Sequence, residues 1–203
     1  LHEGISGFAY NSFISGIGND LRFFDGRGRE LQYDVEKWDT SGRSLVWVEM
    51  AELNASSTLL ACWGNPSAST APAYRGDGSA WSNNFTGVWH FNEKIAGKFT
   101  DSSGLGNFAL ANGDATAATA QVGNGVTVDG NGDYLDLGNT VGNTGDTMMI
   151  SLWVKGHASY TSGSNQRILS SKSAGSSTDG WDIYEGSNNR LNIKIGNSNK
   201  WKT

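Results

Sequence analysis

The sequence has few of the residues that mark several common classes of protein. Cys62 is its single cysteine, so no disulfide can form within the chain, and the fold has to rely on packing or on a bound ion. Charged residues make up only 17% of the chain, its net charge is −5, and Lys and Arg form no cluster, which argues against a nucleic-acid partner. No apolar run approaches the roughly 20 residues that span a bilayer, and no basic-then-apolar leader opens the chain. We therefore expect no membrane insertion in this segment and place any signal peptide or anchor outside it.

Glycine and tryptophan, by contrast, are plentiful. The chain has 28 Gly and 8 Trp among 203 residues but only 2 Pro. Together with the low charge, this composition is typical of many short strands joined by turns, not of helices or of a disordered tail. The composition indicates an all-β protein. The length allows one large domain or two modest ones, and we expect two.

The first part of the chain alternates strand-like runs with turn residues. The runs predict strands at Asp20–Phe24, Glu30–Trp38, Arg43–Met50 and Ser57–Trp63. The connections DGRG, DTSG and GNPSAST have the composition of turns. Strand starts about ten residues apart favour a sandwich of antiparallel hairpins.

A stretch of small residues at 65–84 contains both prolines and has the composition of a linker. We place the domain boundary near Ala80, giving domains at 1–80 and 81–203. Two later runs alternate with period two, so one face of each is expected in the core. The inward residues would be Met148, Ile150, Leu152 and Val154 in the first run, and Leu191, Ile193 and Ile195 in the second.

Both parts of the chain resemble known families. DLRFFD, LQYDVEKWD, SLVWVEM and WGNPSA resemble an uncharacterised β-rich domain that commonly precedes laminin-G-like jelly rolls in bacterial surface proteins. Between Gly87 and Gly156, GVWHFNE, DSSGLGNFAL, VGNGVTVDGNGDYLDLG and ISLWVKG resemble the opening half of a laminin-G-like, concanavalin A-like jelly roll. The resemblance implies an antiparallel β-sandwich followed by a jelly-roll sandwich, in a secreted or cell-surface protein. Both domains look truncated, so we expect the biological protein to be longer.

The loop DSSGLGN combines a carboxylate with Ser and Asn oxygens, which are ligands that suit Ca²⁺. The resemblance implies that a structural calcium ion joins this early loop to the closing strand, with Asp101 and Asn107 as ligands. The alternative is a β-turn in which Asp101 accepts hydrogen bonds from its own backbone.

A second acidic run, DGNGDYLDLG, places Asp129, Asn131 and Asp133 at the spacing that opens an EF-hand loop. Its sixth position is Tyr134, where that loop needs Gly, and its twelfth is Thr140, where it needs Glu. This excludes an EF-hand and favours a tight turn before a strand.

No catalytic set stands out in the sequence, and we expect no enzyme activity from this segment. Paired carboxylates on one strand face, which glycoside hydrolases use, are not expected. Asp182 and Glu185 should point to opposite faces of a strand and be solvent-facing. His90 is expected on the less buried face of its strand, and Cys62 is expected to be buried and unreactive.

Aromatic side chains can stack on the flat faces of sugars while neighbouring polar groups bind the hydroxyls. Four aromatic residues lie among such polar neighbours and are the candidate ligand-binding residues: Tyr160, Trp181, Tyr184 and Trp201. Core packing is the alternative for Trp181 and Tyr184. Trp47, Trp89 and Trp153 lie in apolar strands, where we expect core roles.

These observations favour an extracellular or cell-surface binding module for a polysaccharide or cell-surface glycan. The first alternative is an adhesion or envelope scaffold that binds protein partners, including envelope proteins. The second is an accessory region of a larger glycan-degrading enzyme.

Overall fold

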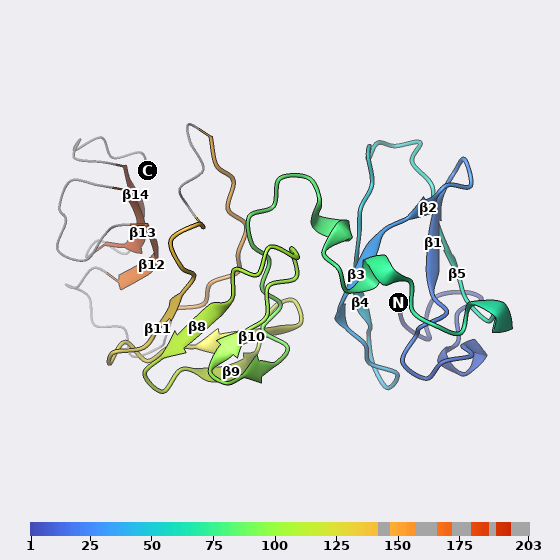
Figure 1. The fold of residues 1–203 in the computed structure, drawn as a ribbon, viewed down its shortest axis with the longest axis horizontal. Coiled ribbons are helices and arrows are strands. Elements are labelled where there is room, and N and C mark those ends of the chain that lie inside the picture. The colour runs from blue at the N-terminus through green and yellow to red at the C-terminus, as the bar shows by residue number, and fades with distance from the viewer. Residues whose placement is uncertain (142–146, 157–165, 172–179, 187–189, 196–203) are drawn as a thin grey trace. The chain divides into compact units, whose positions relative to one another are not determined.

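The computed structural model describes residues 1–141, 147–156, 166–171, 180–186 and 190–195. The chain divides into two compact units, Leu1–Val141 and Gly142–Thr203. All strand pairs in the described residues are antiparallel, and the helices there are short 3₁₀ turns. The all-β class predicted from composition is confirmed (Figure 1).

The first sheet has the strand order β2-β1-β5. Its strands are β1 (Arg22–Asp25), β2 (Glu30–Leu31) and β5 (Leu59–Cys62). Phe23 on the central strand lies opposite both Leu31 and Ala61, so this apolar row faces one side of the sheet. The predicted strands over Asp20–Phe24 and Ser57–Trp63 are confirmed; β1 begins two residues later and ends one residue later than expected, and β5 is shorter at both ends.

A separate two-stranded ribbon pairs β3 (Tyr33–Lys37) with β4 (Leu45–Val48). Because side chains alternate along a strand, Tyr33 and Val35 face the core while Asp34 and Glu36 lie on the opposite face. Asp34 is directly opposite Trp47, so this outer face carries two acids and an aromatic ring. The ribbon thus has the aromatic core on one face and a polar group on the other, where Glu36 is itself buried.

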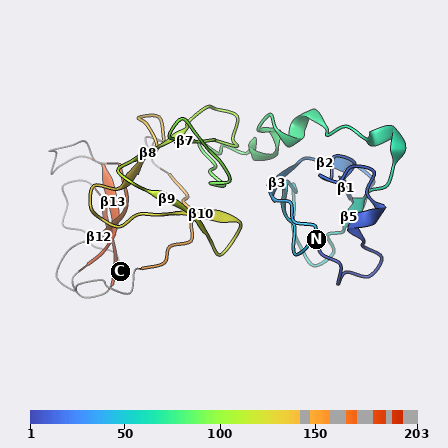
Figure 2. The same ribbon diagram turned by 90° about the horizontal axis from the view of Figure 1, so that it is seen from below.

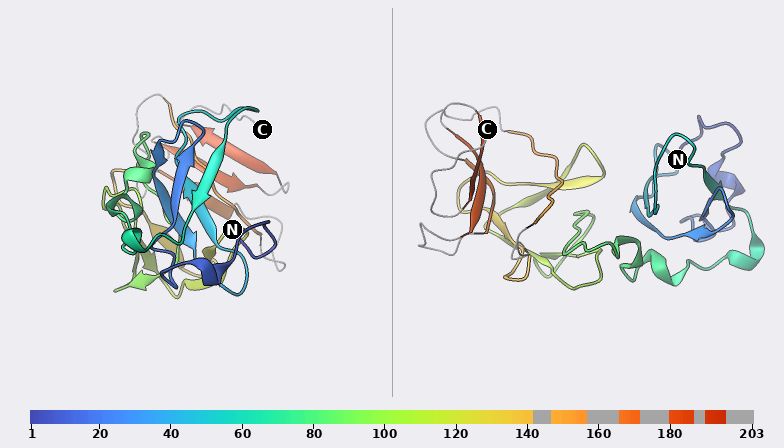
Figure 3. Two further views of the ribbon diagram at one scale, coloured as in Figure 1. Left: turned by 90° about the vertical axis from the view of Figure 1, so that its right-hand side faces the viewer. Right: turned by 90° about the horizontal axis from the view of Figure 1, so that it is seen from above.

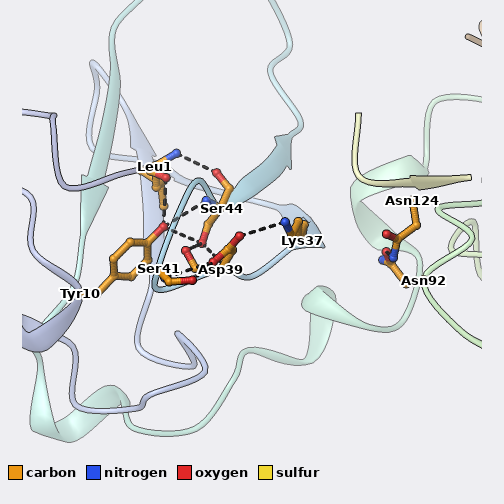
Figure 4. Close-up of polar contacts among 8 residues, drawn as sticks. All are labelled: Leu1, Tyr10, Lys37, Asp39, Ser41, Ser44, Asn92 and Asn124. Atoms are coloured by element: carbon orange, nitrogen blue, oxygen red, sulfur yellow. Dashed lines mark hydrogen bonds and ion pairs between the residues drawn. The ribbon is translucent and has the colours of Figure 1, made fainter. Parts of the chain in front are cut away.

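The core of this region is aromatic. Phe8, Tyr10, Phe13, Phe23 and Tyr33 form a buried cluster in which many rings meet edge to face. Hydrogen bonds also hold the N-terminus against this cluster. Tyr10 is the first residue of η1 (Tyr10–Ser12), and its hydroxyl accepts the Ser44 backbone N–H at 3.0 Å and donates to the Leu1 carbonyl at 3.0 Å (Figure 4).

The stretch at 65–84, predicted as a linker, is packed and contains three 3₁₀ turns. These are η2 (Pro66–Ala68), η3 (Ala73–Arg75) and η4 (Ser79–Trp81). Arg75 donates to the carbonyl oxygens of Ile17 and Gly18 at 3.1 and 3.3 Å. The Tyr74 hydroxyl donates to Glu30 at 2.6 Å. These contacts hold the segment against the β1–β5 region. They do not test the domain boundary near Ala80, which stays a prediction.

A four-stranded sheet follows, with the order β11-β8-β7-β6; two of its strands, β7 and β8, are labelled in Figure 2. Its strands are β6 (Lys94–Ile95), β7 (Lys98–Phe99), β8 (Ala109–Asn112) and β11 (Tyr134–Asp136). The hairpin of β9 (Thr116–Thr119) and β10 (Asn124–Thr127) lies between β8 and β11 in the chain. Phe99 and Ala109 are fully buried on one face of the sheet, and Lys98 and Leu110 are exposed on the other.

The second unit contains a three-stranded sheet, drawn in orange to red in Figure 3. It comprises β12 (Gln166–Ser170), β13 (Trp181–Glu185) and β14 (Leu191–Ile195). The β14 strand is where the sequence predicted it, but its faces are reversed. Asn192 is buried while Ile195 is 64% exposed. Alternation fixes which residues share a face, but it does not fix which face is covered.

Two further expectations for this unit are wrong. Residues 147–156 form no strand, and the side chains of Met148, Leu152 and Val154 are exposed instead of lying in a core. Asp182, expected to face solvent, is only 4% exposed, and its carboxylate accepts a 2.5 Å hydrogen bond from Ser170.

Candidate functional site

A shallow depression of about 300 Å³ lies on the exposed face of the β11-β8-β7-β6 sheet, and we call it the β8 groove. Its side-chain lining consists of Lys98, Asn107, Phe108, Leu110, Asp136 and Leu137. Phe108 is 48% exposed, and the Lys98 ammonium lies 5.9 Å from the centroid of its ring, within the range of a cation–π contact. Gly106 and Gly138, both with φ above 70°, line the groove without adding a side chain.

Strand register explains why these residues meet. Lys98 on β7 is opposite Leu110 on β8, and Leu110 is opposite Asp136 on β11. Directly paired residues of antiparallel strands project from the same face, so a cation and a carboxylate lie on either side of an apolar centre. Within the described residues, neither Lys98 nor Asp136 is part of an ion pair. The Lys98 ammonium can therefore reach a ligand, as can the Asp136 oxygen that accepts no hydrogen bond from the described residues.

The loop before Phe108 is held by the carboxylate of Asp101. One oxygen accepts the backbone N–H groups of Val88 and Ser103 at 2.9 Å each. The other accepts the Ser103 hydroxyl at 2.8 Å and the Asn107 backbone N–H at 2.9 Å. Four donors on one carboxylate fix the backbone that presents Phe108.

Asn107 also makes several hydrogen bonds to neighbouring residues. Its side-chain amide donates to the Thr86 carbonyl at 2.7 Å, and its side-chain oxygen accepts the Thr140 hydroxyl at 2.6 Å. The Trp89 indole N–H donates to the Asn107 carbonyl at 2.8 Å. The calcium site expected at Asp101 and Asn107 stays a prediction; in this conformation a cation would have to displace these donors.

A different acidic group, Asp114, Asp129 and Asp133, brings three carboxylates within 4.8 Å of one another. Asp133 accepts the backbone N–H groups of Asp114 and Asp129 at 2.7 and 3.1 Å. The hydrogen bond and charge of Asp133 raise the pKa of Asp114, while the backbone N–H of Asp129 lowers the pKa of Asp133. Such oxygens could hold a hard cation. The sequence predicted a turn before Tyr134, and the hydrogen bonds to these carboxylates stabilise that turn.

His90 lies at the centre of a cluster of charged and polar groups in the first unit. Its Nε2 lies 2.8 Å from Asp34 Oδ2, and its Nδ1 contacts Glu36 Oε2. The indole N–H groups of Trp81 and Trp47 donate to the same two carboxylates at 2.8 Å each. The Asn92 side chain donates to the Glu36 carbonyl at 2.7 Å and accepts from Asn124 at 3.0 Å, a pair seen in Figure 4.

Burial and pairing shift the pKa values of this cluster. Burial alone would lower the pKa of His90, but hydrogen bonds and charges from Asp34 and Glu36 raise it to about 9. Burial alone would raise the pKa of Asp34, but hydrogen bonds from His90 and Trp81 hold it below its ordinary value. The imidazole is therefore a cation between two carboxylates at neutral pH.

This cluster corrects two expectations. His90 is buried, not placed on an open face. Asp34 and Glu36 are carboxylates two residues apart on one strand face, an arrangement that was not expected anywhere in the sequence. The run YDVEK contains the signal, because its acids alternate with Tyr33 and Val35. The buried imidazole, which is 56 positions away from Asp34 in the sequence, gives no such signal. The expectation of no enzyme activity stays a prediction.

The four predicted ligand-binding aromatics do not form a common surface in the described residues. Trp181 and Tyr184 project from opposite faces of β13, and Tyr184 is buried. Tyr160 and Trp201 lie outside the described residues. The exposed aromatic residue of the β8 groove, Phe108, was missed, although its alternation with Leu110 in the run NFAL places both on one strand face.

Three other placements differ from expectation. Trp153, expected in the core, is 73% exposed, and Trp47 is 44% exposed with its indole bound to Glu36. Cys62, expected to be buried, is exposed on the edge strand β5. Apolar character along a strand therefore did not guarantee burial.

Comparison with known proteins adds a family match for part of the chain. The fold defines an all-β protein with antiparallel sheets. Residues 17–98 match the family model described as "Domain of unknown function (DUF2341)", a range that includes β1 to β6 and the His90 cluster. No curated protein matches the chain.

One solved structure is similar to the chain. It is that of an S-layer domain-containing protein (residues 221–444) from Clostridium thermocellum. The two share 23% identity with a TM-score of 0.48, over 57% of this chain and 54% of that chain. The similarity thus spans about half of each protein. Separately, none of the helices in the described ranges has the length and hydropathy of a membrane span.

Proposed function

We propose that this chain is part of a secreted or cell-surface protein and acts as a binding module for polysaccharide. The observation that carries the proposal is the β8 groove, where a half-exposed aromatic residue lies beside an ammonium and a carboxylate that form no ion pair within the described residues. Sugars present flat C–H faces to aromatic rings, and their hydroxyls both donate and accept hydrogen bonds. The family resemblance of the sequence supports the extracellular location.

The size of the groove agrees with this function. A volume of about 300 Å³ lies at the lower end of the range of small-ligand sites, and the groove is open along the sheet instead of being enclosed. A second cavity, beside Asp34 and Trp81, measures about 40 Å³ and has room for only a few water molecules. Of these two cavities, only the β8 groove is large enough to hold part of a sugar chain.

A glycan array probed with the full chain tests the proposal. Signal on one or more polysaccharides, abolished by an excess of the same soluble polysaccharide, is the expected result. Absence of signal on every glycan, from protein shown to be folded by circular dichroism, would overturn it.

An adhesion or scaffold role with protein partners is the second candidate, favoured by apolar exposure in the second unit. Met149 is 86% exposed, and Trp153 and Ile195 are also largely exposed. Where such side chains form a contiguous patch, the patch is typical of surfaces that bind protein. Cross-linking to envelope proteins that is lost in Trp153→Ser and Ile195→Ser, but kept in Phe108→Ala, would favour this candidate.

A further inference from the structure

The exposed face of the β8 sheet continues beyond the groove to a second aromatic ring. Tyr134 precedes Asp136 by two residues on β11, so the two side chains project from the same face. Tyr134 is directly opposite Asn112 on β8 and is 57% exposed. Phe108 and Asn112 are four residues apart, which corresponds to about 13 Å along a strand. Two exposed rings therefore flank a strip with Leu110 at its centre.

We propose that the ligand of this face is a neutral polysaccharide chain that lies along β8 and stacks one sugar on Phe108 and another on Tyr134. This inference rests on the proposed function and adds the site, the ligand charge and the minimum ligand length. One pyranose ring cannot cover two rings separated by about 13 Å along the strand. A longer chain can, because contact at one ring makes contact at the other intramolecular.

The charges of the strip favour a neutral chain. Lys98 and Asp136 lie on opposite sides of Leu110, so the strip has one positive and one negative group. Hydroxyl groups can accept from the ammonium and donate to the carboxylate at once. A polyuronic acid would instead place carboxylates beside Asp136, on a chain whose net charge is already −5.

The supporting loop gives the strip a fixed shape. The four hydrogen bonds to Asp101 and the three made by Asn107 hold the residues that precede Phe108. On the other side, the Asp136 carboxylate accepts the Gly138 backbone N–H at 2.9 Å through one oxygen. A pre-organised surface binds with less loss of conformational entropy than a mobile one.

Affinity gel electrophoresis of the full chain tests the inference, with hydroxyethylcellulose, xylan and galactomannan as neutral probes and polygalacturonate as the acidic probe. We expect retardation by at least one neutral probe and none by polygalacturonate. Phe108→Ala and Tyr134→Ala should each weaken binding by roughly tenfold or more, as truncation of a central aromatic contact does. Lys98→Met and Asp136→Ala should each weaken it by about three- to tenfold, the value of one hydrogen bond.

Matched variants separate binding from folding. Leu105→Ala removes an exposed apolar side chain from the same loop without touching the strip, and should bind like the wild type. Phe108→Tyr keeps the ring and should retain most of the affinity. Equal melting temperatures across the set show that the sheet is intact.

Ligand length gives an independent measurement. By isothermal titration calorimetry, affinity for oligosaccharides cut from the retained probe should rise with length and then level off. In Tyr134→Ala this rise should be lost, while the affinity for the shortest ligand changes little.

The possible outcomes separate the two proposals. If the wild type binds a neutral probe and both aromatic variants bind equally well, the site is wrong and the proposed function stands. If only polygalacturonate is bound, the inference of a neutral ligand is wrong. If no probe is bound and the glycan array is also blank, both proposals fall.

Discussion

The imidazole Nε2 of His90 lies 2.8 Å from Asp34 Oδ2, and this pair joins two parts of the chain that are far apart in sequence. Asp34 belongs to the β3–β4 ribbon, whereas His90 belongs to the segment that leads into the β11-β8-β7-β6 sheet. The other imidazole nitrogen contacts Glu36, so one cation compensates two carboxylates. Removing it would leave both acids poorly solvated and unpaired.

His90→Gln is therefore expected to lower the free energy of unfolding of the first unit by about 3 kcal/mol or more, because breaking a buried ion pair leaves an uncompensated charge. Urea unfolding followed by tryptophan fluorescence measures the change. His2→Gln, which removes a histidine whose ring accepts one exposed hydrogen bond, is the control and should shift stability by less than about 0.5 kcal/mol. Equal effects of the two substitutions would contradict the role given to His90.

The same pair predicts how stability depends on pH. The pKa of His90 is raised from 6.5 to about 9, so its contribution is complete below pH 6.5 and is lost as the pH rises through 9. The pKa of Asp34 is lowered from 3.8, so its contribution is present above that pH and is lost as the pH falls. The pair therefore stabilises the fold most between about pH 4 and 6.5.

The measurement compares urea unfolding of the wild type and His90→Gln at pH 6 and pH 10. The difference between the two proteins should be about 3 kcal/mol at pH 6 and small at pH 10, since a shift of one pKa unit is worth about 1.4 kcal/mol. A difference that is the same at both pH values would mean that the imidazole acts through packing and not through its charge.

The strands could be predicted from sequence because alternation is local. The runs RFFD, YDVEK and LVWV gave β1, β3 and β4 close to their true positions. Which face becomes buried depends on partners elsewhere in the chain, and there the prediction failed. Leu191 and Ile195 on β14 are exposed, and Trp47 binds Glu36 on the outer face of β3–β4.

In the candidate sites, too, local features could be predicted from the sequence, whereas features that depend on distant parts of the chain could not. The carboxylate of Asp101 does organise its loop, as the turn chemistry of DSSGLGN suggested. The β8 groove, however, exists because Lys98, Leu110 and Asp136 meet through two strand registers. Register is set by hairpin turns and packing, so no single stretch of sequence could reveal this row.

A truncation tests where the first folding unit ends. A chain of residues 1–80 lacks Trp81, His90 and Asn92, which bind the outer face of β3, whereas a chain of residues 1–98 keeps them. We expect the shorter chain to be less stable, because Asp34 and Glu36 lose the hydrogen bonds and the charge that Trp81, His90 and Asn92 supply. Chemical unfolding of both fragments provides the comparison. Equal stability would support a boundary near Ala80.

Asp101→Ala distinguishes a hydrogen-bonding role from a metal-binding role in the loop at 101–107. The substitution removes the acceptor of four hydrogen bonds and should lower the free energy of unfolding by about 2 kcal/mol. If hydrogen bonding is its role, the loss is the same in EDTA and in excess Ca²⁺, and EDTA leaves the wild-type melting temperature unchanged. If a calcium ion is bound, EDTA lowers the melting temperature of the wild type alone, because a ligand of the folded state stabilises it by mass action. Melting curves with and without EDTA, together with elemental analysis of the purified chain, decide between the two, and the hydrogen bonds already made by both Asp101 oxygens lead us to expect the first result.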